Sequence, residues 1–444
     1  MQKTQLLLGQ TLAFASSPFE DGPEAAWHCA RGAVAVVDGV IIGVGPADDL
    51  RAAVPRAEVH DYGDALILPG FIDAHVHYPQ TAIIASWGKR LIDWLNTYTF
   101  PEEMRLRDPD YARKIAKRYF DLALANGTTT MCSYATTAPV SVDAFFEEAQ
   151  ARGMRALTGK TCMDRNAPDG LIDTATSAYD ASKALLEKLH GKDRLSYVIT
   201  PRFAPTSSPE QLEALGVLWR EHPDCLMQTH LSEQVDELAW VAELFPQARD
   251  YLDVYDRFGL LGARGVYGHA IHLSAREQER LNEVRASVVH CPTSNTFIGS
   301  GLFDMGLANT IRVGLATDTG GGSSFSMLRT MAAAYEIAQL RGQALHPAAL
   351  IWLATTGSAR ALRIDDYVGS LQVGYEADLV VLDLASTPAI AQASARAESI
   401  WDAIFPTIMM GDDRAVKATW VSGTKVTPKA LPAWQSSENR FLED

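Results

Sequence analysis

Three features that often define a protein's class are scarce in this sequence. The five cysteines lie far apart and form no Cys-x-x-Cys pair, as expected of reduced thiols in a cytosolic protein: Cys29, Cys132, Cys162, Cys225 and Cys291. No apolar run reaches about 18 residues, the length that a membrane-spanning helix needs. The short run Leu6-Leu7-Leu8 is interrupted by Gly9-Gln10 before the apolar core of a signal peptide can form. We therefore expect a cytoplasmic protein that does not enter a membrane.

Basic residues are also scarce relative to acidic ones. The chain carries 39 Lys and Arg against 54 Asp and Glu, which gives a formal net charge of −15, and it has no basic run. Nucleic-acid binding needs clustered Lys and Arg, so the charge argues against a nucleic-acid partner. The remaining composition, 47% hydrophobic and 21% charged over 444 residues, suits a globular chain with one large core and a smaller one.

Strand patterns occur at both ends of the chain. Residues 33–37 and 40–44 are joined by Asp38-Gly39, a strong hairpin signal, and further strand patterns cover residues 377–382 and 415–421. Two separated β segments predict one small β-sandwich domain that the chain leaves and re-enters. We expect its two parts at residues 1–68 and 366–428, with a polar tail at residues 429–444.

Short apolar strands alternate with helical patterns between these ends. Residues 110–126 have helical spacing and stop at Gly127, Ser208-Pro209 predicts a helix start, and Ser274 with Glu277 forms a capping box. Eight strands are expected, at residues 65–77, 128–134, 155–162, 195–200, 225–230, 265–269, 286–291 and 312–317. Eightfold alternation predicts a (β/α)₈ TIM-like barrel over residues 69–365.

Polar residues gather where these strands end, which is where such a barrel keeps its active site. They are His75, His77, Arg202, His230, His269 and Asp318. Residues two apart in a strand point to one side, so His75 and His77 can bind the same ion. Three histidines and an aspartate around a divalent metal leave a position open for water, and Glu233 follows closely enough to exchange protons with a substrate. We interpret His272, His290 and His346 as structural.

These motifs carry a resemblance to a known family. The run Pro69-Gly70-Phe71-Ile72-Asp73-Ala74-His75-Val76-His77, His230 with Glu233, His269, Asp318 and the split β domain resemble the amidohydrolase superfamily over nearly the whole chain. Residues 195–203 contain no lysine that could bridge two metals, so the mononuclear deaminase branch matches best. Within that branch, residues 78–80, 91–95, 98–101, 159–164, 200–203 and 411–414 are similar to the guanine deaminase family, whereas residues 165–168 depart from its pattern.

The resemblance implies a chemistry for the strand-end residues. One Zn²⁺, with Fe²⁺ as the alternative, would be held by His75, His77, His230 and Asp318. His269 would orient the attacking water, Glu233 would protonate the ring nitrogen N3 during attack at C2, and Asp318 would pass a proton to the departing ammonia. Guanine would become xanthine.

The resemblance also implies the substrate contacts and the assembly. Gln80, Arg202, Phe203 and His230 match guanine-contacting positions, and Trp94 lies in a segment, residues 78–109, expected to be a loop that closes over the purine. A homodimer is implied as well. Two alternatives remain at this point: an amidohydrolase acting on cytosine, 8-oxoguanine or a triazine, and a non-catalytic scaffold. The chain lacks the His-x-Glu and Pro-Cys-x-x-Cys motifs of the cytidine-deaminase type.

Overall fold

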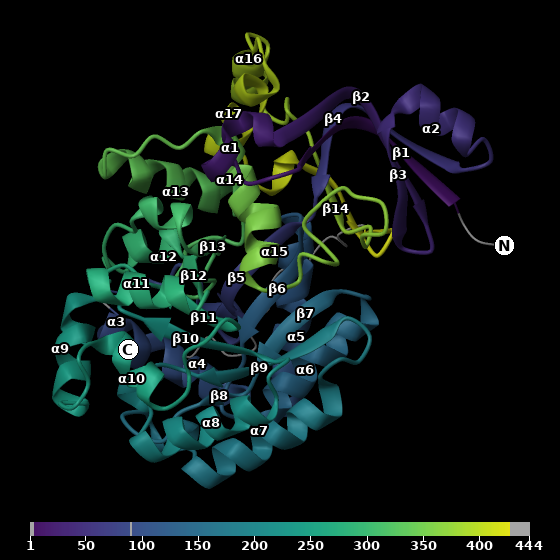
Figure 1. The fold of residues 1–444 in the computed structure, drawn as a ribbon. Helices are drawn as coiled ribbons and strands as arrows, with labels where there is room; N and C mark the ends of the chain where they lie inside the picture. Colours follow the sequence, from purple (N-terminus) through teal and green to yellow (C-terminus); the bar gives the residue numbers. More distant parts are fainter. Residues whose placement is uncertain (1–3, 89–90, 427–444) are drawn as a thin grey trace, which may run out of the picture.

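The strands of the chain form two separate sheets (Figure 1). The computed structural model describes residues 4–88 and 91–426. One sheet has the order β16-β15-β14-β4-β1-β2-β3, and the other runs from β5 to β13 around a barrel. The expected polar tail at residues 429–444 lies outside the described residues, and the predicted domain limits stay predictions.

The first sheet is built from both ends of the chain. Its strands are β1 (Thr4–Phe14), β2 (Ala26–Val37), β3 (Val40–Pro46), β4 (Glu58–Pro69), β14 (Leu379–Leu382), β15 (Val416–Val421) and β16 (Thr424–Val426). Antiparallel pairing of β4 with β14 joins the two ends, with Pro69 opposite Leu379. One apolar cluster includes Ile41 of β3 and Trp420 of β15, so the sheet curls over on itself. The prediction of one β domain made from both chain ends is confirmed.

The second sheet is a nearly closed barrel of parallel strands. They are β5 (Phe71–His77), β6 (Thr128–Tyr134), β7 (Arg155–Gly159), β9 (Leu195–Pro201), β10 (Leu226–Leu231), β11 (Gly265–His269), β12 (Ser287–His290) and β13 (Arg312–Leu315), with the short β8 (Thr161–Cys162) beside β9. Apolar side chains from several strands, including Ile72, Val198 and Val266, fill one layer of its interior. The predicted (β/α)₈ barrel is confirmed.

One predicted strand was wrong. Residues 65–77 were expected to form a single strand, but the chain divides them between β4 of the first sheet and β5 of the barrel. The chain passes from the first sheet to the barrel at Gly70, whose N–H donates to the Asp378 carbonyl at 2.8 Å. A Cβ at this position would lie 2.2 Å from Thr129 Oγ1, so a side chain has no room there.

Most helices surround the barrel and connect its strands, whereas α2 lies on β1, β2 and β3 of the first sheet (Figure 1). The longer ones are α5 (Pro109–Ala125), α6 (Pro139–Ala151), α7 (Ala175–Leu189), α8 (Pro209–Glu221), α9 (Val235–Leu244), α10 (Tyr251–Arg257), α11 (Ala275–Glu283), α13 (Met327–Leu340), α16 (Pro388–Ser394) and α17 (Ile400–Met410). The others are α1 (Pro18–Asp21), α2 (Ala47–Ala53), α3 (Leu91–Trp94), α4 (Phe100–Arg105), α12 (Pro292–Phe297), α14 (Pro347–Trp352) and α15 (Ser358–Ala361). The predicted caps at Ser208 and Ser274 are confirmed, since each hydroxyl accepts a backbone N–H of its helix.

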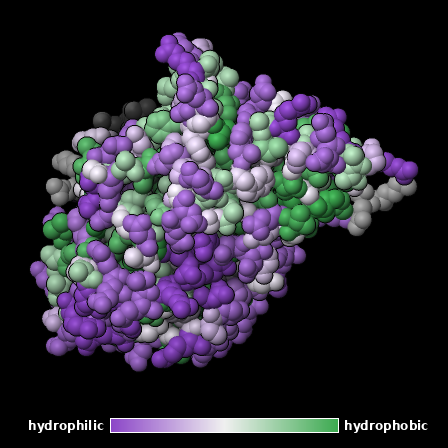
Figure 2. All heavy atoms as spheres, turned by 45° about the horizontal axis from the view of Figure 1, so that its top comes forward, coloured by the Kyte–Doolittle hydropathy of each residue, from purple (hydrophilic) through white to green (hydrophobic). Residues whose placement is uncertain are grey.

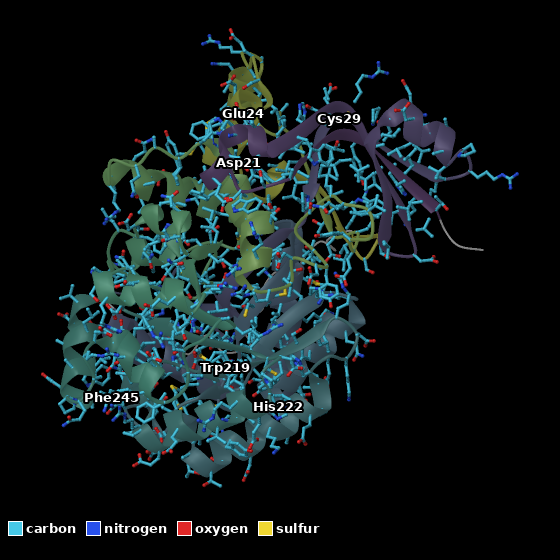
Figure 3. All side chains as sticks on the ribbon, in the orientation of Figure 1. Asp21, Glu24, Cys29, Trp219, His222 and Phe245 are labelled. Atoms are coloured by element: carbon cyan, nitrogen blue, oxygen red, sulfur yellow. The ribbon has the colours of Figure 1, made fainter. Side chains whose placement is uncertain are left out.

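The polar surface and the free cysteines agree with what the composition predicts. Hydrophilic side chains predominate over the lower part of the face shown in Figure 2. Among the described helices, none has the length and apolar character to cross a membrane. All five cysteines are free, and the partly exposed Cys29 lies on β2, well away from the barrel helix that carries Trp219 (Figure 3).

His290 is a buried residue, and its structural role stays a prediction. It ends β12, is 0% exposed, and its ring stacks on Phe303 with centroids 4.4 Å apart. Neither ring nitrogen has a hydrogen-bond partner among the described residues. Burial, with a smaller contribution from His269, lowers the pKa of His290 to about 3. The folded protein therefore keeps this imidazole neutral.

This burial predicts an acid sensitivity. Below pH 6.5 the unfolded chain binds a proton at His290 that the folded protein does not bind, so this contribution to stability is lost as the pH falls towards 3. At pH 5 the loss is about 2 kcal/mol. We expect the melting temperature of His290→Leu to fall less between pH 7.5 and 5 than that of the parent. The partly exposed His222 (Figure 3) provides the control, and equal falls in His290→Leu and His222→Leu would contradict the prediction.

Candidate active site

The predicted strand-end residues come together at one end of the barrel. His75 and His77 lie in β5, His230 in β10 and His269 at the end of β11, while Asp318 follows β13. All five side chains are buried, with exposed fractions between 1% and 9%. The parallel strands place them there because each contributes its carboxyl end to the same rim.

Three imidazoles, those of His75, His77 and His230, converge, and the Asp318 carboxylate approaches the first two. The Nε2 atoms of His77 and His230 are 3.1 Å apart, and Asp318 Oδ1 lies 3.5 Å from His75 Nε2 and 3.6 Å from His77 Nε2. Two ligands of one tetrahedral zinc ion are separated by about 3.3 Å. His75 Nε2 and Asp318 Oδ1 are buried without a hydrogen-bond partner among the described residues. Such orphaned atoms are costly unless an ion satisfies them, so this donor set fits a divalent cation.

The protonation of the histidines suits the same role. Burial, followed by the charge of neighbouring histidines, lowers the pKa of His75, His77 and His230 well below the ordinary value. His230 Nδ1 lies 2.7 Å from the Arg202 carbonyl oxygen, which can only accept, so Nδ1 carries the hydrogen and the Nε2 lone pair faces the centre. Neutral imidazoles with a free Nε2 are metal ligands.

A second face of the centre holds ionisable groups. His269 Nε2 lies 3.6 Å from Glu233 Oε2 and 3.8 Å from Asp318 Oδ2. Burial opposes protonation of His269, but the charges of Glu233 and Asp318 raise its pKa above the ordinary value. Burial raises the pKa of Asp318 to about 6, and His269 opposes this shift. His269 Nε2 therefore lies between two carboxylates.

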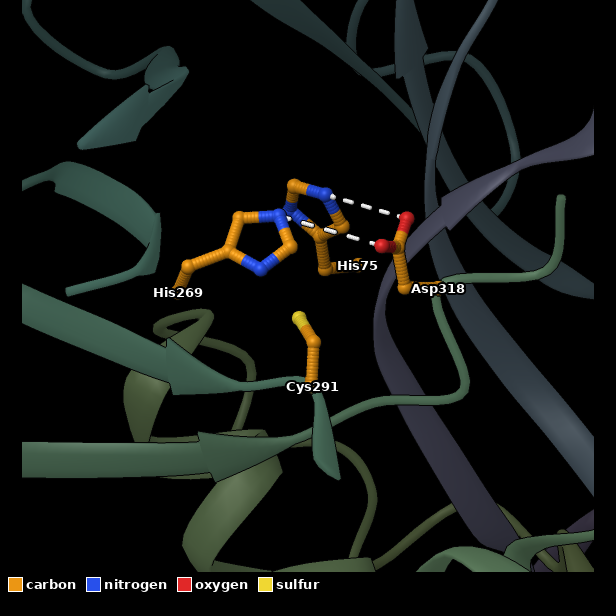
Figure 4. A group of neighbouring side chains, drawn as sticks. All are labelled: His75, His269, Cys291 and Asp318. Atoms are coloured by element: carbon orange, nitrogen blue, oxygen red, sulfur yellow. Dashed lines mark ion pairs between the residues drawn. The ribbon is translucent and has the colours of Figure 1, made fainter. Parts of the chain in front are cut away.

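Cys291 lies beside this face (Figure 4). Its Sγ belongs with His75, His269 and Asp318 to a second group of possible ligand atoms, and the figure marks the ion pairs of Asp318 with the two histidines. Burial raises the pKa of the Cys291 thiol well above its ordinary value. Since the thiolate is the form that binds metal, the imidazole and carboxylate set fits a cation better.

The backbone is strained where these side chains leave the strands. Ser232, His269 and Asp318 have positive φ angles of 50°, 66° and 48°. Non-glycine residues seldom adopt this region, and such strain clusters at active sites and ligand clamps.

A pocket adjoins the centre. It is lined by His77, Gln80, Trp94, Leu95, Arg202, Phe203, His230, Glu233, His269, Ile298, Asp318 and Gly321. Every predicted substrate-contacting residue is in this set. The expected loop over residues 78–109 was wrong in its structure, because short helices from Tyr78 to Arg105 occupy most of the described part. It nevertheless forms a pocket wall through Gln80 and Trp94.

Two functional candidates escaped the sequence analysis. Glu103 of α4 joins Gln80 to Arg202 through hydrogen bonds, and Ser300 donates from Oγ to Glu233 Oε1 at 2.7 Å. Neither belongs to the strand-end pattern. The Pro-Glu-Glu sequence of α4 was the available signal for Glu103, but it does not show which of the two buried glutamates contacts Gln80 and Arg202.

Comparisons with known proteins agree with the geometry. The model of the amidohydrolase family matches residues 66–426, and the chain therefore belongs to the amidohydrolase family. It is 45% identical to a guanine deaminase of Escherichia coli strain K12 over 83% of this chain and 84% of the relative. Among solved structures it is similar to "E. coli Guanine Deaminase", with a TM-score of 0.93, 41% identity and coverage of 95% and 99% of the two chains. A guanine deaminase from C. acetobutylicum with bound guanine gives a TM-score of 0.87 at 28% identity, covering 96% and 100%.

Proposed function

We propose that the protein is a guanine deaminase, which hydrolyses guanine to xanthine and ammonia in purine catabolism. One observation carries this function. The same pocket is lined by histidines and the aspartate of the candidate metal position and by Gln80, Arg202 and Phe203, which match guanine-contacting positions. The similarity to guanine deaminases over most of the chain supports it.

We assign the metal position to His75, His77, His230 and Asp318, with a single Zn²⁺ as the proposed ion and Fe²⁺ as the alternative. A divalent cation there lowers the pKa of water towards about 7 and so supplies hydroxide at neutral pH. The absence of lysine from β9, the fourth barrel strand, supports one ion rather than a bridged pair.

The proton transfers fall to three side chains. Glu233 protonates N3 as C2 is attacked, and the Ser300 hydroxyl on its Oε1 leaves Oε2 facing His269. His269 orients the attacking water. Asp318 accepts a proton from that water and passes it to the amino group, which leaves as ammonia when the C2–N bond breaks. The Glu233 carboxylate takes the remaining hydroxyl proton as the C2 carbonyl forms.

Residues of the pocket wall recognise the purine through hydrogen bonds and stacking. Guanine presents O6 and N7 as acceptors, and arginine is well suited to this edge. Arg202 and Gln80 supply donors, Phe203 supplies a stacking face, and Trp94 closes one side of the pocket. We also propose a cytoplasmic homodimer, which rests on composition and on the family resemblance.

The metal position yields the first test of this function. A Cβ at Gly268 would lie 2.5 Å from His75 Cε1, so Gly268→Ala should displace the His75 ring and weaken metal binding by about 10-fold or more. We expect elemental analysis to find about one zinc ion per parent chain. Chelation should abolish ammonia release and Zn²⁺ should restore it. Two ions per chain, or full metal retention in Gly268→Ala, would contradict the assignment.

Glu233 yields a separate prediction. Glu233→Gln should keep the fold and the metal but lose about 10²–10⁴-fold in kcat, because it removes the general acid and base. Glu243→Gln, an exposed change on α9 further along the chain, should leave kcat unchanged. Near-parental turnover in Glu233→Gln would remove Glu233 from the mechanism.

Substrate choice yields the third prediction. Adenine presents an amino donor where guanine presents O6, so it would face the donors of the pocket wall. Buried mismatches cost about 1–3 kcal/mol each, and two of them predict a preference for guanine on the order of 10³. Arg202→Ala should sharply reduce kcat/KM for guanine at unchanged metal content. Comparable ammonia release from adenine or cytosine would show that the pocket accepts another substrate.

A further inference from the structure

A buried carboxylate stands behind the pocket wall and takes no part in the chemistry above. Glu103 of α4 is 0% exposed, and each of its oxygens has a partner. Oε1 accepts from Gln80 Nε2 at 3.0 Å, and Oε2 accepts from Arg202 Nη1 at 2.7 Å in an ion pair. One side chain thus joins the two pocket residues that read the purine, which come from distant parts of the chain.

The contact with Glu103 sets the orientation of the Gln80 amide. An ionised carboxylate only accepts hydrogen bonds, so the NH₂ group of Gln80 must face it. The amide oxygen then lies on the other side, towards Gly320, where an added Cβ would be 2.0 Å from Gln80 Oε1. The positions of the Gln80 donor and acceptor at the pocket wall are therefore fixed by these contacts.

The same helix fixes Arg202. Its guanidinium carbon lies 5.5 Å from the centroid of Phe100, which precedes Glu103 on α4. Arg202 is 3% exposed, and its charge is balanced by Glu103. With one nitrogen held by the carboxylate, the guanidinium keeps its other N–H groups in a fixed plane at the pocket wall.

Two purines differ in the hydrogen-bonding groups that would face Gln80 and Arg202. Guanine presents O6 as an acceptor and N1–H as a donor, whereas 2,6-diaminopurine presents a 6-amino donor and an N1 acceptor. Both carry the 2-amino group, so hydrolysis at C2 would break the same C–N bond and release ammonia from each. We infer that Glu103 is a specificity-determining positioning residue, which selects 6-oxo over 6-amino purines by holding Gln80 and Arg202. The inference rests on the proposed guanine deaminase function.

Glu103→Gln separates orientation from shape. The new amide must turn its oxygen to Arg202, so its NH₂ faces Gln80 and requires the Gln80 oxygen there. The Gln80 amide turns over, and whichever atom it shows to the purine changes from donor to acceptor or the reverse. At Gln80 the exchanged group matches the inverted edge of 2,6-diaminopurine, while Arg202 remains a donor.

The measured quantity is the ratio of kcat/KM for guanine to kcat/KM for 2,6-diaminopurine, both from ammonia release. We expect Glu103→Gln to lower this ratio by at least about tenfold, the value of one exchanged hydrogen-bond pair, at parental metal content. Glu102→Gln is the matched control: Glu102 is a buried neighbour on α4 that bonds Arg105 and Tyr111 instead, and its variant should keep the parental ratio.

The double variant Gln80→Glu with Glu103→Gln serves where the single change does not fold. It keeps the number of buried charges and places an acceptor-only group at position 80, so the ratio should again fall. An unchanged ratio in the folded Glu103→Gln protein, or in the double variant, would overturn the inference. A parent enzyme that releases no ammonia from guanine would instead overturn the proposed function, so the two failures are distinguishable.

Discussion

The closure of the barrel between its first and last strands is the constraint on which the active site depends. The Asp318 N–H donates to the His75 carbonyl at 3.0 Å, and the His77 N–H donates to the Thr319 carbonyl at 3.2 Å. Below them, buried Asp73 accepts from the backbone and the hydroxyl of Thr317. The candidate metal ligands of β5 and of the β13 end are therefore tied through their own backbones. Their spacing is set by sheet geometry before any ion binds.

Much of this site could be predicted because it follows from local pattern and parallel topology. His75, His77, His230, His269 and Asp318 each end or follow an apolar strand, and parallel strands in a barrel bring such positions to one rim. The division at Gly70 was missed because the residues on either side of it are equally apolar. The pairing of β4 with β1 and β14, and of β5 with β6, shows that they belong to different sheets.

Glu103 could not be predicted for a different reason. It stands beside Glu102 in a short segment, and both glutamates are buried on α4. Glu102 pairs with Arg105 three residues away, whereas Glu103 reaches Arg202, 99 residues away. Local pattern does not distinguish two such neighbours, because the difference lies in tertiary contacts. The same holds for Ser300, whose partner Glu233 is 67 residues distant.

The sheet shared by the two chain ends has a consequence for synthesis. β4 pairs on one side with β1 and on the other with β14, and Leu379, the partner of Pro69, emerges from the ribosome about 310 residues later. At roughly 5–20 residues per second, this takes about 15–60 s. Throughout that interval the outer edge of β4 has no strand to pair with, and an open edge invites association with other chains. The barrel strands are therefore synthesised while the edge of β4 that later pairs with β14 is still open.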